Sequence, residues 1–292
     1  MSPKTLVLGA SGFLGSHFIQ SPVDEVYQFR SAPILEIPFS IFFDPFDLVE
    51  LEKIIVSHRL GAIVNCIALA NIEDCERDTT SAFKINSEYP KALAKLCKAH
   101  SVHLVHVSTD AVLSGDGGIL DESSLAQPKS IYGESKLLGE KFVLQASPNF
   151  SVARVNFFGV NPRGNSIFDF FYDALSKEDV VPGFSDVFFS PLYVLDTVRA
   201  LRVLASDKYP GLIHLAGSPI SKFRFGCTVA KLLGCKVELV IETQVRDLPL
   251  AKTRSLDLSV SNKRMLQIYE PAFSLEAGIV RSIEQRKREV LE

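Results

Sequence analysis

The chain has 292 residues, of which 47% are hydrophobic and 22% are charged, and its formal net charge is −3 at pH 7. This composition is that of an ordinary globular protein and excludes disordered and fibrous architectures. Because 31 basic and 34 acidic side chains are mixed without long runs of one sign, we expect no nucleic-acid or membrane partner and a small molecule instead.

The first 155 residues alternate short β-branched runs with longer helical patterns, which is typical of βαβ units around a parallel sheet. Apolar periodicity predicts strands over 5–8, 25–29, 62–66, 102–107 and 151–155, and helices over 12–20, 48–58, 80–99 and 132–146. This order predicts an α/β fold with a doubly wound parallel sheet over residues 1–155.

Beyond residue 155 the pattern loosens, because prolines and glycines divide it into short elements. We expect residues 156–292 to form a smaller α/β lobe that binds the substrate. Part of 186–206 is expected to be woven back into the first domain. An amphipathic pattern over 274–291 predicts a closing helix.

Cysteine usage and the N-terminal segment bear on the compartment. The five cysteines are odd in number and include no C-x-x-C pair, which argues against a disulfide framework and a zinc site. Residues 5–23 lack charged side chains but are too polar for a signal peptide or a membrane span. The sequence therefore predicts a cytoplasmic protein.

Three glycines follow the first predicted strand at intervals of three residues: Gly9, Gly12 and Gly15. Glycine is needed at such a turn because a Cβ would block the approach of the backbone to a pyrophosphate, whose charge the helix N-terminus stabilises. This turn predicts dinucleotide binding. The other turn residues expected to touch the cofactor are Ser11, Phe13 and Leu14.

The second predicted strand ends at Arg30 and Ser31, where an acidic residue would bind the ribose 2′-hydroxyl of NAD. An arginine at this place pairs with the 2′-phosphate of NADP. The two residues therefore favour NADP, with NAD as the alternative. Asp44 and Pro45 precede the next helix and either line the adenine pocket or form a helix-start turn.

A second group of polar residues includes Thr109, at the end of a buried strand, and Tyr132 and Lys136, which open a helix. Tyrosine and lysine four residues apart share a helix face, so the ammonium can lower the pKa of the phenol. Tyr132 would then be a competent proton donor or acceptor. Thr109 is suited to hydrogen-bonding a substrate carbonyl at the carboxyl end of its strand.

A series of segments carries a family resemblance over residues 4–160: the glycine turn, Asp44–Asp47, Val64–Ala68, Ile72–Glu76, Ile85–Asn86, Val107–Val112 and Ile131–Glu140. In these segments the chain resembles the extended short-chain dehydrogenase/reductases, which have a Rossmann fold. Within them it is similar to the dTDP-4-dehydrorhamnose reductases.

The resemblance implies an NAD(P)H-dependent reduction of the 4-keto group of a nucleotide-linked 6-deoxy-hexulose, with a homodimer as an option for assembly. Tyr132 would protonate the forming alkoxide, Lys136 would hold the nicotinamide ribose, and Thr109 would orient the carbonyl. Asn86 matches the position that supports the lysine. Asn65 and Ala68 match the loop beneath the cofactor.

The resemblance also implies a set of substrate-facing residues. Lys252 and Arg254 stand where the family has Arg-Pro, and are expected to contact a diphosphate. Some relatives bind Mg²⁺ through an acidic residue at the position of His17, so no metal is expected here. The other residues expected to face the sugar or its nucleotide are Ala70, Asp110, Asn156, Phe157 and Asn165.

Two other functions stay open on the sequence. One is a nucleotide-sugar epimerase or 4,6-dehydratase; dehydratases carry an acid pair after the threonine, whereas Ala111 follows Asp110 here. The other is a non-catalytic NADP-binding subunit similar to the regulatory β subunit of methionine adenosyltransferase.

Overall fold

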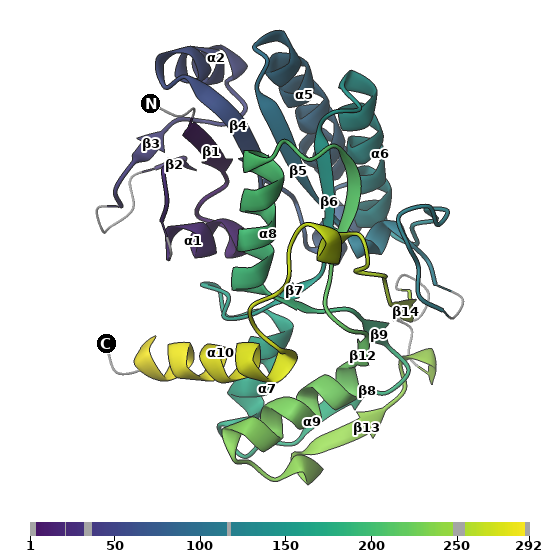
Figure 1. Ribbon diagram of the computed structural model, residues 1–292. Helices are drawn as coiled ribbons and strands as arrows, with labels where there is room; N and C mark the ends of the chain where they lie inside the picture. The colour runs from purple at the N-terminus through teal and green to yellow at the C-terminus, as the bar shows by residue number, and fades with distance from the viewer. Residues whose placement is uncertain (1–3, 21, 32–36, 116–117, 248–254, 290–292) are drawn as a thin grey trace. The chain divides into compact units, whose positions relative to one another are not determined.

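The computed structural model describes residues 4–20, 22–31, 37–115, 118–247 and 255–289 (Figure 1). The chain folds into two compact units. The first comprises residues 1–112, 130–154 and 198–213, and the second comprises 113–129, 155–197 and 214–292. The chain therefore passes between the units repeatedly, and each unit is described in turn.

The first unit is built on a seven-stranded sheet with the strand order β11-β6-β5-β4-β1-β2-β3. The pairs β1–β2, β2–β3, β1–β4 and β4–β5 are parallel. After β3 the chain crosses to the other side of β1, so the winding reverses between β1 and β4. Ligands of such sheets bind beyond the carboxyl ends of the strands at this reversal. The strands are β1 (Lys4–Leu8), β2 (Glu25–Phe29), β3 (Ser40–Phe42), β4 (Leu60–Asn65), β5 (His103–Thr109), β6 (Ser151–Val155) and β11 (Gly211–Leu215).

Helices cover both faces of this sheet, as expected for a doubly wound fold (Figure 1). On one face, α2 (Leu48–Ser57), α5 (Tyr89–Ala99) and α6 (Ile131–Ala146) bury apolar residues against β1, β4 and β5. On the other face lie α1 (Phe13–Ile19) and α8 (Val194–Ser206). Arg202 of α8 donates to the carbonyl of Phe18 and pairs with Glu25 of β2 at 2.8 Å.

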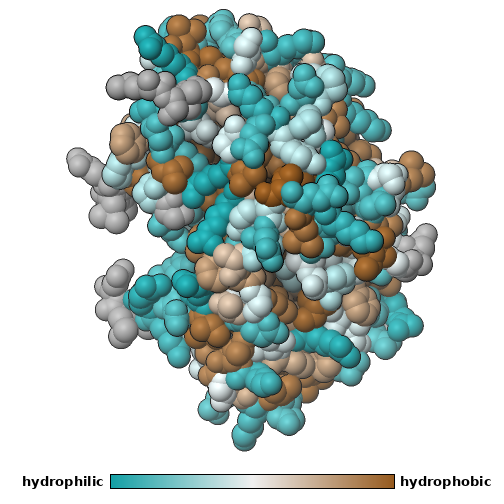
Figure 2. All heavy atoms as spheres, viewed as in Figure 1, coloured by the Kyte–Doolittle hydropathy of each residue, from teal (hydrophilic) through white to brown (hydrophobic). Residues whose placement is uncertain are grey.

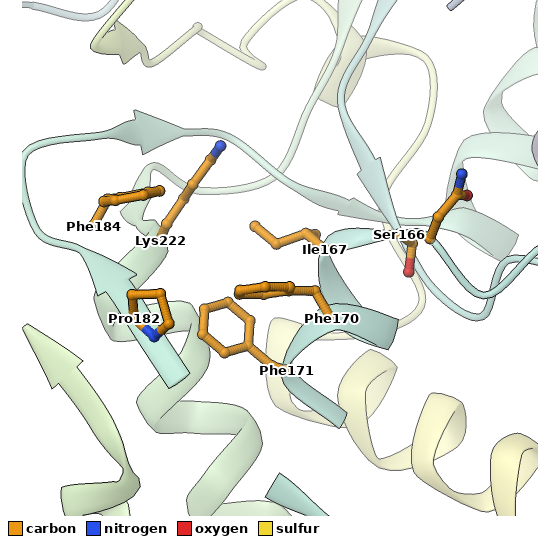
Figure 3. A pocket seen from close by; sticks show the side chains of 8 residues that line it. Ser166, Ile167, Phe170, Phe171, Pro182, Phe184 and Lys222 are labelled. Atoms are coloured by element: carbon orange, nitrogen blue, oxygen red, sulfur yellow. The ribbon is translucent and has the colours of Figure 1, made fainter. Parts of the chain in front are cut away.

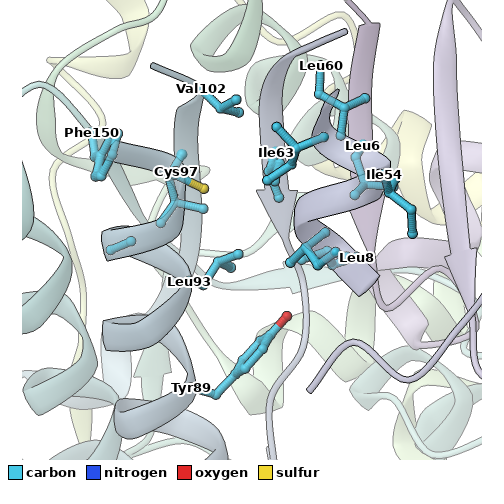
Figure 4. Close-up of a cluster of buried hydrophobic side chains, with 14 of the residues drawn as sticks. Leu6, Leu8, Ile54, Leu60, Ile63, Tyr89, Leu93, Cys97, Val102 and Phe150 are labelled. Carbon is cyan, nitrogen blue, oxygen red and sulfur yellow. The ribbon is translucent and has the colours of Figure 1, made fainter. Parts of the chain in front are cut away.

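The core beneath α2 and α5 follows from the period-two alternation of the strands. Leu6 and Leu8 of β1 face these helices, where they meet Ile63, Leu93 and Cys97 (Figure 4). Fully buried apolar side chains at these positions provide the main stabilisation of the unit.

The segment between β4 and β5 differs from the sequence prediction of one helix over 80–99. Instead α3 (Ile72–Arg77) and α4 (Thr79–Phe83) come first, and a π-helical turn over Lys84–Glu88 separates α4 from α5. Strands β3 and β11 were also not predicted. Strand β3 has only three residues, and β11 begins directly after Pro210, where the sequence has a turn signal.

The second unit contains small sheets and three helices among the described residues. Its helices are α7 (Ile167–Leu175), α9 (Lys222–Leu233) and α10 (Leu275–Glu289), and its core is aromatic: Phe225 contacts the rings of Phe158, Phe171 and Phe189. The strands pair as β7 (Phe157–Phe158) with β10 (Leu192–Tyr193), β8 (Val181–Phe184) with β13 (Val240–Thr243), and β12 (Ile220–Ser221) with β9 (Phe188–Phe189) and β14 (Asp257–Leu258).

No helix in the described part of the chain is both long enough and apolar enough to cross a membrane.

Candidate functional site

The glycine turn lies at the carboxyl end of β1, beside the reversal of the sheet. Gly9 has φ +80°, a conformation that favours glycine. The buried Gln28 of β2 fixes the turn, because its Oε1 accepts from the Gly9 N–H at 3.0 Å while its Nε2 donates to the Phe43 carbonyl at 2.8 Å. A Cβ at Gly15 would lie 2.1 Å from the Gly9 carbonyl oxygen, so only glycine lets α1 start this close to the turn.

The start of α1 suits an anionic ligand. Gly12 is the N-cap of α1, and Phe13 and Leu14 begin the helix. The first turn of α1, all of it described, contains no acidic side chain that would repel an anion. Ser11 is exposed beside it. A side chain at Gly12 would project into the space that a pyrophosphate needs.

The predicted specificity residues lie at the carboxyl end of β2. Arg30 and Ser31 are exposed, and the guanidinium carbon of Arg30 is 5.5 Å from the centroid of the Phe46 ring. Asp44 is also exposed, and its Oδ1 accepts from the Phe46 N–H at 3.1 Å, while Pro45 is buried. The loop before α2 therefore lies next to the end of β2.

The loop after β4 is held by two buried asparagines. Asn65 donates from Nδ2 to Nδ1 of His106 at 3.2 Å and accepts from the Ile67 N–H. Burial lowers the pKa of His106 well below its ordinary value, so its neutral ring can accept this bond. His106 is a supporting residue that the sequence did not identify.

Asn86 fastens the same loop to α6. Its Oδ1 accepts from the Leu69 N–H at 2.9 Å, and its Nδ2 donates to the Leu69 carbonyl and to Ser135 Oγ at 3.0 Å. The π-helical turn places it there, and such turns are frequent at functional sites. Ala68 and Ala70 are exposed in the loop that Asn86 fixes.

Thr109 and Tyr132 meet at the carboxyl end of β5. The Thr109 side chain lies close enough to the Tyr132 phenol to influence its pKa, and Thr109 Oγ1 donates to Asp110 Oδ1 at 3.2 Å. Two caps set the start of α6: Ser130 Oγ accepts from the Gly133 N–H, and Glu76 Oε1 accepts from the Ile131 N–H. Burial raises the pKa of Tyr132 to about 12, although the nearby Thr109 side chain acts to lower it. The phenol is therefore protonated at neutral pH.

Lys136 follows one helical turn later and is only 1% exposed. Its Nζ donates to the Val107 carbonyl of β5 at 2.6 Å. Burial lowers the pKa of Lys136 to about 8, although the carboxylate of Glu140 acts to raise it. The predicted lowering of the Tyr132 pKa by this ammonium is not found, because burial dominates and the ammonium is bound to the backbone of β5.

A buried ion pair supports this end of the sheet and was not identified from the sequence. Glu140 accepts from Arg154 Nη2 of β6 at 2.8 Å and from Ser108 Oγ at 2.6 Å. Glu140 is 3% exposed and Arg154 5%. The only sequence signal was the position of Glu140, four residues after Lys136 on the same helix face.

The predicted substrate residues divide between the units. Ala70 and the buried Asp110 belong to the first unit, and Asp110 lies close enough to Tyr132 to influence its pKa. Asn156, Phe157 and Asn165 belong to the second unit. Lys252 and Arg254 lie outside the described residues.

The second unit contains a hollow of about 240 Å³ near Asn165 (Figure 3). Ile167 and Phe170 of α7 face it opposite Lys222 of α9, and Asn165 Oδ1 accepts from Asn161 Nδ2 at 2.6 Å. Phe170, which lines the hollow, is 51% exposed, and Figure 2 shows apolar residues interspersed with polar ones over the face of the molecule in view. The lining residues are Asn165, Ser166, Ile167, Phe170, Phe171, Pro182, Phe184 and Lys222.

No group of three or more potential metal-binding side chains was found among the described residues.

Residues 3–286 match a family model described as RmlD substrate binding domain. A probable low-salt glycan biosynthesis reductase of Haloferax volcanii is 26% identical over 88% of this chain and 89% of its own length. The dTDP-4-dehydrorhamnose reductase of Mycobacterium tuberculosis is 28% identical, covering 90% of this chain and 86% of that protein. A solved dTDP-4-dehydrorhamnose reductase of Bacillus anthracis, in complex with NADP, superposes with a TM-score of 0.83 at 21% identity, over 98% of this chain and 99% of that one.

Proposed function

The chain belongs to the family of the RmlD substrate binding domain, the dTDP-4-dehydrorhamnose reductase family, and we propose that it reduces dTDP-4-dehydrorhamnose to dTDP-L-rhamnose with NADPH. The observation that carries this proposal is that Tyr132 and the buried Thr109 lie together at the carboxyl end of β5, with the buried Lys136 one helical turn away. A carbonyl reduction needs a protonated acid at such a place.

The residues at the end of β1 and β2 fit a dinucleotide. The glycine turn before α1 offers backbone without side chains for a pyrophosphate, and the exposed Arg30 supplies a cation for a 2′-phosphate. Asp44 and Pro45 border the adenine side, and Asn65 and Ala68 lie in the loop beneath the cofactor. When bound, the reduced nicotinamide supplies the hydride that the carbonyl carbon accepts.

The chain's own residues supply the proton and the orientation. Tyr132 gives its hydroxyl proton to the carbonyl oxygen as that oxygen gains negative charge, and its high pKa keeps the proton available at neutral pH. Thr109 orients the carbonyl by hydrogen bonding. Lys136 has three donor protons, so it can keep its bond to Val107 and also bind ribose hydroxyls. Asn86 maintains the loop beside them.

The nucleotide end of the substrate fits the hollow of the second unit. Phe170 offers an apolar ring for a flat base, and the Lys222 ammonium suits a diphosphate. Of the residues expected to face the substrate, we assign Asn165, Asn156 and Phe157 of the second unit to this nucleotide sugar. In this assignment the first unit binds the cofactor and the second binds the substrate.

Three further properties belong to the same proposal. The substrate of the chain is a nucleotide sugar, the chain is located in the cytoplasm, and it assembles as a homodimer. The cysteine pattern supports the compartment, and the family supports the nucleotide sugar.

The first test supplies purified protein with dTDP-4-dehydrorhamnose and follows oxidation of NADPH, with NADH in parallel. We expect turnover, faster with NADPH, and Tyr132→Phe should retain NADPH affinity while losing most turnover. Tight NADPH binding without oxidation of either cofactor would contradict reduction of this substrate, and would mean either that another keto-sugar is the substrate or that the chain is a non-catalytic subunit. Turnover of Tyr132→Phe near that of the unmodified chain would remove Tyr132 as the acid.

A further inference from the structure

We propose that Phe46 is a positioning residue that sets the preference for NADPH over NADH by holding the guanidinium of Arg30 over its ring. This inference rests on the proposed contact between Arg30 and the 2′-phosphate. In this inference Phe46 contacts the Arg30 side chain and does not contact the 2′-phosphate itself.

Three side chains, those of Tyr89, Phe46 and Arg30, contact one another in a row that runs from the core to the surface. Tyr89 of α5 is 5% exposed and lies in the core cluster of the first unit (Figure 4). The Phe46 ring is half-buried, and its centroid is 4.7 Å from that of Tyr89. The exposed Arg30 lies over Phe46 at 5.5 Å. The buried Tyr89 ring therefore limits the movement of the Phe46 ring, and the Phe46 ring in turn holds the Arg30 guanidinium.

The backbone of Phe46 is also fixed. Asp44 Oδ1 accepts from its N–H, and the buried Pro45 before it has a restricted φ. Asp47 after it caps α2 by accepting from the N–H groups of Val49 and Glu50. The ring consequently has little freedom to move away from the end of β2.

An exposed arginine loses rotamer freedom when it binds a phosphate, and a guanidinium already held on a ring loses less. Preorganisation of this kind strengthens binding of the group that the arginine contacts. The 2′-phosphate is the only part that distinguishes NADPH from NADH. Support of Arg30 by Phe46 should therefore change the ratio of the two affinities, whereas a contact with adenine would change both equally.

The test measures dissociation constants for NADPH and NADH by fluorescence titration, without substrate. Phe46→Leu removes the ring and should reduce the NADPH/NADH affinity ratio about two- to fivefold, the size of an exposed cation–π contact. Phe46→Tyr keeps a ring and should restore the ratio. In an Arg30→Ala background, Phe46→Leu should change the ratio no further.

Phe42→Leu is the matched control, because Phe42 is an exposed phenylalanine on the neighbouring β3 whose ring pairs with Phe29 at 6.1 Å. It should leave the ratio unchanged. Circular dichroism checks the fold of each variant, and Phe46→Met, which keeps the apolar volume, replaces Phe46→Leu if that variant does not fold.

Two results would overturn the inference. One is equal weakening of NADPH and NADH by Phe46→Leu, which would place the ring against the adenosine that both cofactors share. The other is an unchanged ratio in Phe46→Leu while Arg30→Ala lowers it. If Arg30→Ala itself leaves the ratio unchanged, the proposed 2′-phosphate contact fails first.

Discussion

At the scale of single residues, the site combines the protonated phenol of Tyr132 with the ammonium of Lys136, whose pKa lies close to neutral pH. Burial disfavours the charged form of both groups. It therefore raises the pKa of Tyr132 to about 12 and lowers the pKa of Lys136 to about 8. Tyr132 is therefore held in the form that donates a proton. Lys136 loses its charge within the range of pH accessible to assays.

This difference predicts how activity depends on pH. Lys136 carries its charge below about pH 8 and loses it as the pH rises through its pKa, so kcat/KM should fall above about pH 8. The charged or titratable groups that act with it are Glu140, Cys66 and His106. The measurement is a pH–rate profile with NADPH and dTDP-4-dehydrorhamnose.

Lys136→Arg supplies the control for this profile, because a guanidinium stays charged throughout the range. Whatever its absolute rate, that variant should lack the fall near pH 8. The same fall in Lys136→Arg, or a flat profile in the unmodified chain, would assign the titration to another group.

At the scale of elements, the site depends on how closely α6 passes the π-helical turn. Gly139 of α6 faces the Asn86 carbonyl, and a Cβ there would lie 2.2 Å from that oxygen. The same helix carries Tyr132, Lys136 and Glu140 on neighbouring turns. A shift of α6 would therefore displace the proposed acid and its supporting residues together.

Gly139→Ala tests this packing. Alanine has the higher helix propensity, but the clash with backbone should outweigh it and lower the free energy of unfolding by about 1–3 kcal/mol, as overpacked cores show. Urea denaturation measures the change. Lys141→Ala, at an exposed position of the same helix, should stay within about 0.5 kcal/mol. A Gly139→Ala protein as stable as the unmodified chain would mean that α6 can move without cost.

The ion pair of Glu140 and Arg154 belongs to this scale as well. It joins α6 to β6, and the Ser108 hydroxyl joins both to the end of β5. A buried pair of this kind is strongly destabilising to break, because one charge is left without its partner.

At the scale of the whole molecule, the chain builds two compact units in alternation, and the proposed function assigns the cofactor to one and the substrate to the other. Residues 198–213 return to the first unit because β11 pairs beside β6 at the edge of the large sheet. Under the proposed function, cofactor and nucleotide affinity should therefore respond to substitutions in different units.

Phe170→Ser tests this division. Removing an aromatic ring from the hollow should weaken dTDP binding about two- to tenfold and leave the dissociation constant for NADPH unchanged. Isothermal titration with each ligand measures both. Val180→Ser, at an exposed apolar position of the same unit outside the hollow, is the control. Unchanged dTDP affinity in Phe170→Ser would place the nucleotide elsewhere.

The sequence by itself determined the fold class and the family. The short β-branched runs and the helical patterns over residues 1–155 predicted the parallel sheet and its main helices, because central strands are buried on both faces and helices bury one face. The glycine turn and the Tyr132–Lys136 spacing could also be identified from the sequence, since the geometry of each depends on a few neighbouring residues. The site roles assigned to them stay predictions.

Only the tertiary structure decided what these residues contact. Lys136 is bound to Val107, Asn86 to Leu69 and Ser135, and Arg154 to Glu140 across separations of 29, 17, 49 and 14 residues. Such contacts depend on which strands are neighbours and on a helix interrupted by a π-helical turn, and no local pattern encodes either. The direction of the Tyr132 pKa shift follows from the same cause, because burial is a property of the assembled fold.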